Sequence, residues 1–442
     1  MSEHTSNRVV FTKEMRKDYT ILVPMMVPIH FELIKNVMNN SGYKVEILTN
    51  CSRQVIEEGL KYVHNDTCYP ALVVIGQMID ALNSGKYDLS KTALLMSQTG
   101  GGCRASNYIH LMRKAMAKAG YGHLPIISAN LSGLEENPGF KITIPIIRKL
   151  VATLLYGDML MLLSNQVRPY ENNHGEADRL ISRWVSDLTE QFNAGKGLGM
   201  AEMRKNLDDI AASFAEIEIT RVPKVRVGVV GEIFVKYSAL ANNGLEEFLA
   251  SQDCEVMVPG LLNFLLFKVD NRLEDHKLYG GNPLKYAVVN TLMDYCLKME
   301  SEFLGVLKNY PQFVSPTPYH HLKGLVKDFI GYGSKMGEGW LLTAEMAELI
   351  EQGYGNIVCT QPFGCLPNHI NGKGMIHRLR AKYGDAANIV AIDYDPSATK
   401  VNQENRIKLM LAVGKEQLES ESATVHEIYK VREQEHHTLQ AV

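Results

Sequence analysis

The chain has 442 residues, enough for two or three domains that each bury a hydrophobic core. Its 46 basic and 49 acidic residues leave a net charge of -3, so the composition gives no reason to expect nucleic acid or an anionic membrane as a partner. The N-terminus lacks the apolar stretch of a signal peptide, and the longest apolar run is short and interrupted by Asp158. We therefore expect a cytoplasmic protein that does not enter a membrane.

Four apolar, β-branched runs in the first part of the chain predict buried strands. They are residues 19–26, 43–49, 92–99 and 124–130, and helical patterns such as residues 105–120 separate them. This alternation is typical of a parallel sheet that helices cover on both faces. The sequence therefore predicts an N-terminal α/β lobe over residues 1–140.

The strand signal is absent over residues 141–222, where successive helical patterns predict a helical connector. Alternation returns over residues 223–412 and predicts a second α/β lobe. Its strands are expected at residues 224–235, 254–260, 355–361 and 388–395, with a helical insertion at about 283–350. Residues 413–442 read as a charged C-terminal helix or tail. The fold class is therefore α/β, with two Rossmann-like parallel-sheet lobes and a helical connecting region.

Four of the seven cysteines occupy the places where α/β folds carry functional groups. Cys359 ends a predicted strand, and Cys68, Cys103 and Cys365 begin predicted helices. Exposed N–H groups and the helix dipole lower the pKa of a thiol at such a position and favour a metal-thiolate centre. Because the four cysteines come from both halves of the chain, we predict a metal site in the cleft between the lobes.

Plain packing is the competing interpretation of these cysteines, because free cysteine is among the most buried residue types. We favour packing for Cys254, which begins an apolar strand, and for Cys296, which lies inside a helix. Cys51 follows a strand without supporting neighbours, and the sequence leaves its role open.

The stretch "QTGGGCR" contains the glycines Gly100, Gly101 and Gly102, followed by Cys103 and Arg104. Three glycines between a strand and a helix could hold a phosphate with their N–H groups, but the Walker lysine is missing. The glycines could instead let the backbone approach a bulky inorganic centre, whose charge Arg104 would balance.

Four further residues lie near predicted strand ends or near cysteines and could move protons: Glu232, Lys236, His64 and His369. Each of these residue types, taken singly, is more often a structural hydrogen-bonding group than a catalyst. We retain them as catalytic candidates because of their positions.

The cysteine-bearing stretches resemble a known family. The segments "KYVHNDTCYPALVVIGQ", "QTGGGCRASNYI", "VGEIFVKYSALANNGLEEFL" and "QPFGCLPNHINGKGMIHRLR" are similar to proteins related to 2-hydroxyacyl-CoA dehydratase and acyl-CoA dehydratase activase. The resemblance spans about residues 9–412. It implies an iron-sulfur protein with a cluster held at the interface of two Rossmann-like lobes by Cys68, Cys103, Cys359 and Cys365.

The resemblance also implies partners. In the wider superfamily a separate ATP-hydrolysing activator with its own iron-sulfur cluster delivers low-potential electrons, and dehydratases use them for radical chemistry on a CoA thioester. The activator is often fused at the N-terminus, whereas this chain opens on the cysteine-bearing unit, so we expect a separate activator. The substrate would be a CoA thioester or another small molecule, and both a homodimer and a heterodimer remain open.

The type of cluster follows from the number of thiols. A 4Fe-4S cluster needs three or four protein ligands, whereas an 8Fe-9S double cubane needs about six thiolates, so we favour the smaller cluster. Two alternative functions remain open. The chain could be a non-catalytic electron carrier or cluster scaffold, or it could bind a nucleotide and a structural zinc ion.

Overall fold

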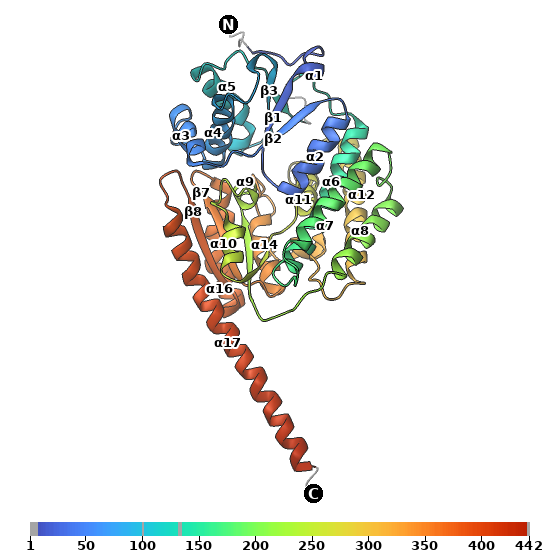
Figure 1. The fold of residues 1–442 in the computed structure, drawn as a ribbon, viewed down its shortest axis with the longest axis vertical. Helices are drawn as coiled ribbons and strands as arrows, with labels where there is room; N and C mark the ends of the chain where they lie inside the picture. Colours follow the sequence, from blue (N-terminus) through green and yellow to red (C-terminus); the bar gives the residue numbers. More distant parts are fainter. Residues whose placement is uncertain (1–7, 100, 131–134, 440–442) are drawn as a thin grey trace.

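The computed structural model describes residues 8–99, 101–130 and 135–439. Its framework consists of two four-stranded sheets in which every strand pairs in parallel. The predicted α/β class with two parallel sheets is thereby confirmed. Figure 1 shows the first sheet and its helices above the second, with a helical region alongside both.

The N-terminal sheet has the strand order β2-β1-β3-β4. Its strands are β1 (Thr20–Pro24), β2 (Lys44–Leu48), β3 (Thr92–Ser97) and β4 (Ile126–Ala129). The helices around it are α1 (Met15–Asp18), α2 (Pro28–Asn40), α3 (Arg53–Tyr62), α4 (Tyr69–Asn83) and α5 (Tyr108–Lys118), with 3-10 turns η1 (Leu89–Lys91) and η2 (Arg104–Ser106). We call this part the N-lobe. Helix α4 is buried over almost its whole length because its sequence "YPALVVIGQMIDAL" is apolar on every side.

Three long helices follow the N-lobe: α6 (Ile144–Val167), α7 (Glu176–Asn193) and α8 (Met200–Ala215). Asp158, the acidic residue inside the apolar run of α6, is buried and joins separate parts of the chain. Its carboxylate lies 2.9 Å from His30 Nε2 and accepts hydrogen bonds from the N–H groups of Leu261 and Leu262. A buried carboxylate is tolerated here because every oxygen has a partner.

The C-terminal sheet has the strand order β6-β5-β7-β8, which repeats the plan of the first sheet. Its strands are β5 (Val225–Gly231), β6 (Cys254–Met257), β7 (Asn356–Pro362) and β8 (Asn388–Tyr394). Its shorter helices are α9 (Ile233–Tyr237), α10 (Leu245–Ser251), α14 (Leu341–Glu351), α15 (Leu366–Asn371) and α16 (Ile376–Tyr383), with 3-10 turns η3 (Lys373–Met375) and η4 (Gly384–Ala386). We call this part the C-lobe.

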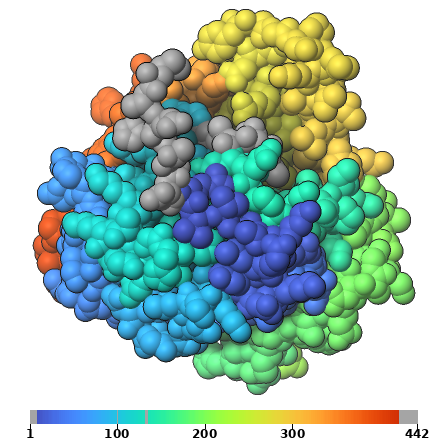
Figure 2. All heavy atoms as spheres, turned by 90° about the horizontal axis from the view of Figure 1, so that it is seen from above, coloured from blue at the N-terminus to red at the C-terminus, as the bar shows by residue number. Residues whose placement is uncertain are grey.

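Between β6 and β7 the chain inserts α11 (Leu261–Tyr279), α12 (Pro283–Leu307) and α13 (Tyr319–Gly324). Figure 2, which views the molecule from the N-lobe side, shows this insertion in yellow beside the blue and cyan N-lobe. The insertion therefore belongs to the C-lobe in sequence but flanks both lobes.

The last helix, α17 (Lys400–Leu439), continues without a break through the predicted boundary at residue 413. Its first half packs along β8, and its second half projects from the body of the molecule (Figure 1). Among the described helices, none has both the length and the apolar character needed to cross a membrane.

One strand was predicted too long. The sequence predicts a strand over residues 224–235, but β5 ends at Gly231 and a helix begins two residues later. Gly231 has a φ of +146°, and a Cβ at this position would lie 1.9 Å from Thr360 Oγ1, so only glycine fits. Glu232 then caps the new helix by accepting a hydrogen bond from the N–H of Val235.

Candidate functional site

Both sheets change the direction of their strand order at the same relative place, between β1 and β3 in the N-lobe and between β5 and β7 in the C-lobe. Ligands of open α/β sheets bind at such switch points, beyond the carboxyl ends of the strands. Cys103 follows β3, Cys365 follows β7 and Glu232 follows β5. Three of the predicted site residues therefore lie at the switch points.

Three cysteines cap the beginnings of helices, as the sequence predicts. Cys68 precedes α4, Cys103 precedes η2 and Cys365 precedes α15, and none of the three thiols caps its helix by a hydrogen bond. In α4 and α15 a proline follows the cysteine by two residues, in the first helical turn, where its missing N–H group costs nothing. The three cysteines are thus fixed at helix starts, and none of their thiols forms a disulfide.

Contacts between the lobes bring these cysteines together. The N–H of Tyr69 donates a hydrogen bond of 3.0 Å to the carbonyl of Phe363, so the segments of Cys68 and Cys365 lie side by side. Gly364 has a φ of +71°, and its missing Cβ would lie 3.0 Å from the Cα of Cys68. We call Cys68, Cys103 and Cys365 the thiol site.

Cys103 joins the thiol site through the segment that precedes α14. A Cβ at Gly337 would lie 3.9 Å from Cys103 Sγ and 3.1 Å from Cγ of Pro367, which is two residues beyond Cys365. The electrostatic effect of Cys103 reaches both other thiols and raises their pKa. The N-lobe therefore supplies two of the three thiols and the C-lobe supplies one.

Two carboxyl groups and a tyrosine border the thiol site. Tyr108 OH lies 3.1 Å from Cys68 Sγ. Glu232 and Glu338 both accept hydrogen bonds at the start of α9, Glu338 from the N–H of Ile233 at 3.0 Å. Burial and the negative charge of Glu338 raise the pKa of Glu232 to about 8, so Glu232 carries a proton near neutral pH.

Burial dominates the acidity of the three thiols. Cys68 and Cys365 expose only 5% and 7% of their surface. Burial raises the pKa of all three thiols, and the nearby carboxylates raise it further. The expectation that helix N-termini lower these pKa values is therefore wrong for the metal-free protein, because desolvation outweighs the helix dipole. A cation at the site would oppose both effects.

Cys359 lies apart from the thiol site. The sequence predicts Cys359 at the end of a strand, but β7 continues for three more residues, and Cys359 pairs with Val230 and Ala391 inside the sheet. Its side chain is fully buried against Asn368, with 3.6 Å between Sγ and Oδ1. Burial first, and then Asp393, raises the pKa of Cys359 to about 12. The prediction that Cys359 ends the strand is wrong, because β7 also includes Thr360, Gln361 and Pro362.

The remaining catalytic candidates have different surroundings. Lys236 is buried and lies 3.3 Å from both carboxylate oxygens of Glu345, so its charge serves an ion pair. His64 is exposed and lies 3.6 Å from Asp66. His369 is exposed on α15. Of the four predicted catalytic residues, the structure brings only Glu232 to the thiol site.

The glycine stretch has one clear contact. A Cβ at Gly102 would lie 2.6 Å from Met336 Sδ, so Gly102 lets the C-lobe side chain rest on the N-lobe backbone. Gly101 has a φ of +87° and faces open space. Arg104 is exposed, and Gly100 lies outside the described residues. The sequence predicts that these glycines let another group approach the backbone closely. At Gly102 the group that does so is the side chain of Met336.

Sequence reasoning missed Glu338, Tyr108 and Lys268. Lys268 Nζ donates a hydrogen bond to the carbonyl of Gly337, and burial lowers its pKa although Glu338 and Cys103 oppose this. The glycine-rich segment "GYGSKMGEGW" is the signal that could have drawn attention to Glu338. The other two residues lie on regular helices, and only the assembled fold places them here.

Of the other cysteines, Cys51 is exposed, whereas Cys254 and Cys296 are buried. Cys254 begins β6, and Cys296 lies on α12, where its side chain packs in the core. Neither of the buried pair reaches the thiol site through a described contact.

The thiol site matches the donor chemistry of an iron-sulfur cluster, which takes thiolates from cysteine. Within residues 8–99, 101–130 and 135–439, no three side chains of histidine, cysteine, aspartate or glutamate are arranged to hold a single metal ion. The ligands of a cluster bind different irons and are spaced more widely than those of one ion, so this observation concerns a single ion only.

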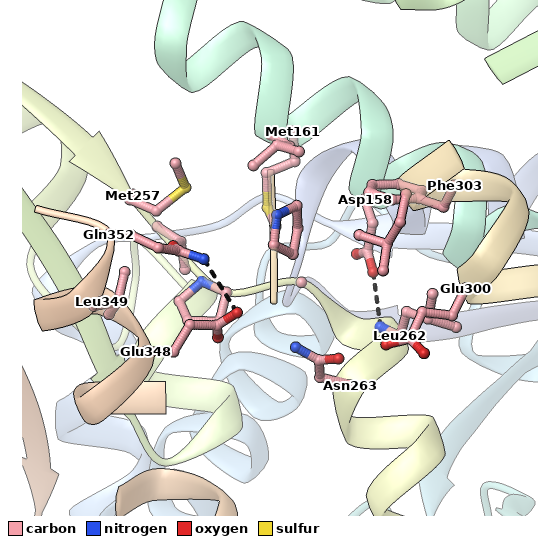
Figure 3. Close-up of a pocket in the computed structure, with 16 residues that line it drawn as sticks. Asp158, Met161, Met257, Leu262, Asn263, Glu300, Phe303, Glu348, Leu349 and Gln352 are labelled. Atoms are coloured by element: carbon pink, nitrogen blue, oxygen red, sulfur yellow. Dashed lines mark hydrogen bonds between the residues drawn. The ribbon is translucent and has the colours of Figure 1, made fainter. Parts of the chain in front are cut away.

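A separate cavity of about 50 Å³ lies between α6, α11, α12 and α14. Figure 3 shows Asn263 in it, with Glu348 and Glu300 on either side. Burial raises the pKa of Glu300 and of Glu348 to about 7. Each carboxylate also accepts a backbone hydrogen bond of 2.7 Å, from Tyr319 and Thr317 respectively. The cavity has room for a few water molecules and contains none of the predicted site residues.

No protein-family model matches the chain, and no curated protein matches it either. The functional conclusion therefore has to come from the site itself.

Proposed function

We propose that this chain is the iron-sulfur component of a two-protein system. In this proposal it accepts low-potential electrons from a separate ATP-hydrolysing activator and uses them for reductive or radical chemistry on a bound substrate. The observation that carries the proposal is the meeting of Cys68, Cys103 and Cys365 at the interface of the lobes, with Cys103 and Cys365 at the switch points of the two sheets. Three thiols from distant segments, without a disulfide and gathered beside two carboxyl groups, point to a function beyond packing.

These three cysteines would hold the cluster, at the interface predicted for it. The proposal leaves out Cys359, which was predicted as a fourth ligand, because its thiol packs against Asn368 inside the C-lobe. Three thiols fit a 4Fe-4S cluster with one iron free of cysteine, and they are too few for the 8Fe-9S double cubane. When bound, such a cluster supplies single electrons at low potential.

The neighbouring side chains have roles that do not depend on the type of cluster. Glu232 carries a proton near neutral pH and could donate it to a substrate at the thiol site, as general acids with a raised pKa do. Lys268 brings a positive charge towards Cys103 and Glu338 and so offsets part of the negative charge there. Lys236, fixed by Glu345, holds α9 against α14 and keeps Glu232 in position.

An apolar rim beside the thiol site supports docking of a partner or of an acyl group. Four large apolar side chains are exposed in the segment before α14, in the turn before α15 and on α15: Met336 (55%), Phe363 (43%), Leu366 (62%) and Ile370 (46%). Exposed apolar side chains that cluster near a functional group mark interaction sites. We propose the activator as the protein partner and a CoA thioester as the substrate class.

Metal and sulfide analysis of anaerobically purified protein tests the cluster. We expect about four irons and a similar amount of acid-labile sulfide per chain. Stoichiometric zinc without sulfide would support the zinc and nucleotide alternative and end the proposal.

Spectroscopy separates catalysis from simple electron transfer. The EPR spectrum of the reduced protein should change when a CoA thioester is added, and reduction should require activator and ATP. A spectrum that no thioester changes, together with full reduction by dithionite alone, would leave the electron-carrier alternative.

A further inference from the structure

The segment between α13 and α14 covers the thiol site. Residues 333–340, with the sequence "GSKMGEGW", place Gly337 beside Cys103 and Met336 on Gly102. We call residues 333–340 the cover. Cys103, the thiol that the cover touches, is half-buried, and the other two thiols of the site are almost completely buried, although a working site must admit a ligand or substrate. Some part of the structure therefore has to move.

The cover is firmly attached to the C-lobe and its insertion. Trp340, at its end, is fully buried and packs edge-on against Phe267. Lys335 forms an ion pair with Asp275, and Ser334 Oγ donates a hydrogen bond of 2.9 Å to Asn371. These contacts fix both ends of the cover on one side of the cleft.

The middle of the cover is attached differently. Towards its own lobe, Lys268 Nζ donates a hydrogen bond of 2.5 Å to the carbonyl of Gly337, and Glu338 accepts one from Ile233. Towards the N-lobe, the described contacts are those of Met336 with Gly102 and of Gly337 with Cys103. No hydrogen bond joins the cover to the N-lobe in the part of the chain that the structure describes. On the N-lobe side, van der Waals contacts among the described residues therefore hold the cover beside Cys103, and the hydrogen bond from Lys268 fixes the conformation of its middle.

Two glycines in the cover allow a local movement. Gly337 and Gly339 have φ angles of +58° and +49°, in the region that other residues rarely adopt. They lie between the buried anchor Trp340 and the half-exposed tip Met336. Rotation about these residues would lift Met336 while both ends of the cover stay in place.

We propose that residues 333–340 form a gate over the thiol site, which opens when Met336 leaves Gly102 and which Lys268 holds shut. Lys268 is thus a positioning residue. The inference rests on the proposed function only in taking Cys68, Cys103 and Cys365 as the working site. It concerns access to the thiols and makes no use of a bound cluster.

The test measures how fast Cys103 is alkylated by N-ethylmaleimide in metal-free protein, prepared with a chelator, with peptide mass spectrometry as the readout. The exposed Cys51 and the buried Cys296 serve as internal references. Gly102→Ala places a Cβ where Met336 lies and should raise the rate at Cys103 relative to Cys51 about tenfold, because the closed state loses its main contact. The φ of Gly102 lies outside the left-handed region, so alanine brings no backbone strain.

A double-mutant cycle makes the test specific. Met336→Ala should also raise the rate, and Gly102→Ala should add nothing once Met336 is alanine, because the two residues act through one contact. Lys268→Met should raise the rate at Cys103, and Lys268→Arg should keep it low. Gly305→Ala, at a helical glycine that faces open space, is the matched control.

Three results would overturn the gate: an unchanged ratio of Cys103 to Cys51 in Gly102→Ala, independent effects of the two substitutions, or an equal increase at Cys296, which would indicate general loosening. None of these depends on iron. Loss of the gate would therefore leave the proposed cluster standing, and absence of iron would leave the gate standing.

Discussion

The two lobes have the same strand order but contribute different functional side chains to the thiol site. Each sheet has its first strand beside its third, and each third strand leads to a cysteine of the thiol site, Cys103 or Cys365. The helix that leads into the third strand begins with Cys68 in the N-lobe. In the C-lobe the corresponding helix, α14, follows closely after Glu338.

The two lobes therefore bring different functional groups to the thiol site. The N-lobe contributes two thiols and Tyr108, whereas the C-lobe contributes one thiol, two carboxyl groups and a lysine. A repeated fold therefore fixes where functional side chains stand, and the residue type at each place decides what they do. The interface of the lobes thus combines two thiols and a tyrosine from the N-lobe with a thiol, two carboxyl groups and a lysine from the C-lobe.

The largest expected effect tests whether both lobes hold the cluster. Cys103→Ala and Cys365→Ala should each lose nearly all of the iron, because each removes one of three ligands. Cys359→Ala, a matched substitution in the same strand-turn-helix unit, should keep the iron. Iron analysis after anaerobic purification decides the matter. An equal loss of iron in Cys359→Ala would show that Cys359 is also a ligand and would restore the four-cysteine ligand set.

The next largest effect concerns the buried ion pair between Lys236 and Glu345 in the C-lobe. Lys236→Met leaves Glu345 buried without its partner and should lower the free energy of unfolding by roughly 3 kcal/mol. Urea unfolding at pH 8 measures it. The double variant Lys236→Met/Glu345→Leu should regain most of the loss, since no buried charge is left behind. If the double variant is no more stable than the single one, the pair is not what stabilises α9 against α14.

The pH dependence of stability tests the two carboxyl groups, Glu300 and Glu348, that line the cavity between α6, α11, α12 and α14. Glu300 and Glu348 have a pKa raised from 4.5 to about 7 in the folded state. Between these pH values the unfolded chain releases protons that the folded chain retains, so the stability that these two groups contribute falls as pH rises from about 4.5 to about 7 and is level above it. Each group should account for roughly 3 kcal/mol.

Glu348→Gln removes one of these titrations and keeps a side chain that can accept the Thr317 hydrogen bond. It should therefore flatten part of the fall in stability between pH 5 and pH 8, as followed by chemical denaturation at both pH values. A profile identical to that of the unmodified protein would show that Glu348 does not titrate there.

The smallest expected effect lies in the N-lobe. Tyr108→Phe removes the hydroxyl that lies 3.1 Å from Cys68 Sγ and should cost about 1 kcal/mol of stability without loss of iron. Tyr121→Phe, which removes an exposed hydroxyl bonded to Asn83, is the control and should cost less. If Tyr108→Phe lost iron, Tyr108 itself would take a direct part in holding the cluster.

The framework of the fold could be predicted because its strands are strongly apolar. Each of the eight strands overlaps a predicted run, from residues 19–26 for β1 to residues 388–395 for β8. The failure at residues 232–235 has a local cause. The residues "IFV" favour a strand by composition, but the conformation of Gly231 and the cap by Glu232 start a helix instead.

The sequence predicts a site residue only where the position of that residue at the start of a helix is enough to identify it. Cysteines at helix starts could be found from the sequence, and Cys68, Cys103 and Cys365 meet in the fold. Cys359 lies inside the predicted strand over residues 355–361, and only the assembled fold shows that its side chain packs against Asn368. Glu338 and Lys268 come from distant segments, and only the insertion of α11 between β6 and β7 brings Lys268 to the thiol site.

The hydrogen bond between the lobes beside the thiol site is made by two backbone groups, the N–H of Tyr69 and the carbonyl of Phe363. Almost any residue can supply these groups, apart from proline at position 69. The side chains at both positions are therefore free to drift during evolution while the spacing between Cys68 and Cys365 is preserved. Gly364 is the exception, since its φ of +71° and its closeness to Cys68 tolerate no side chain. Among relatives of this chain, the glycine should be retained where its neighbours are not.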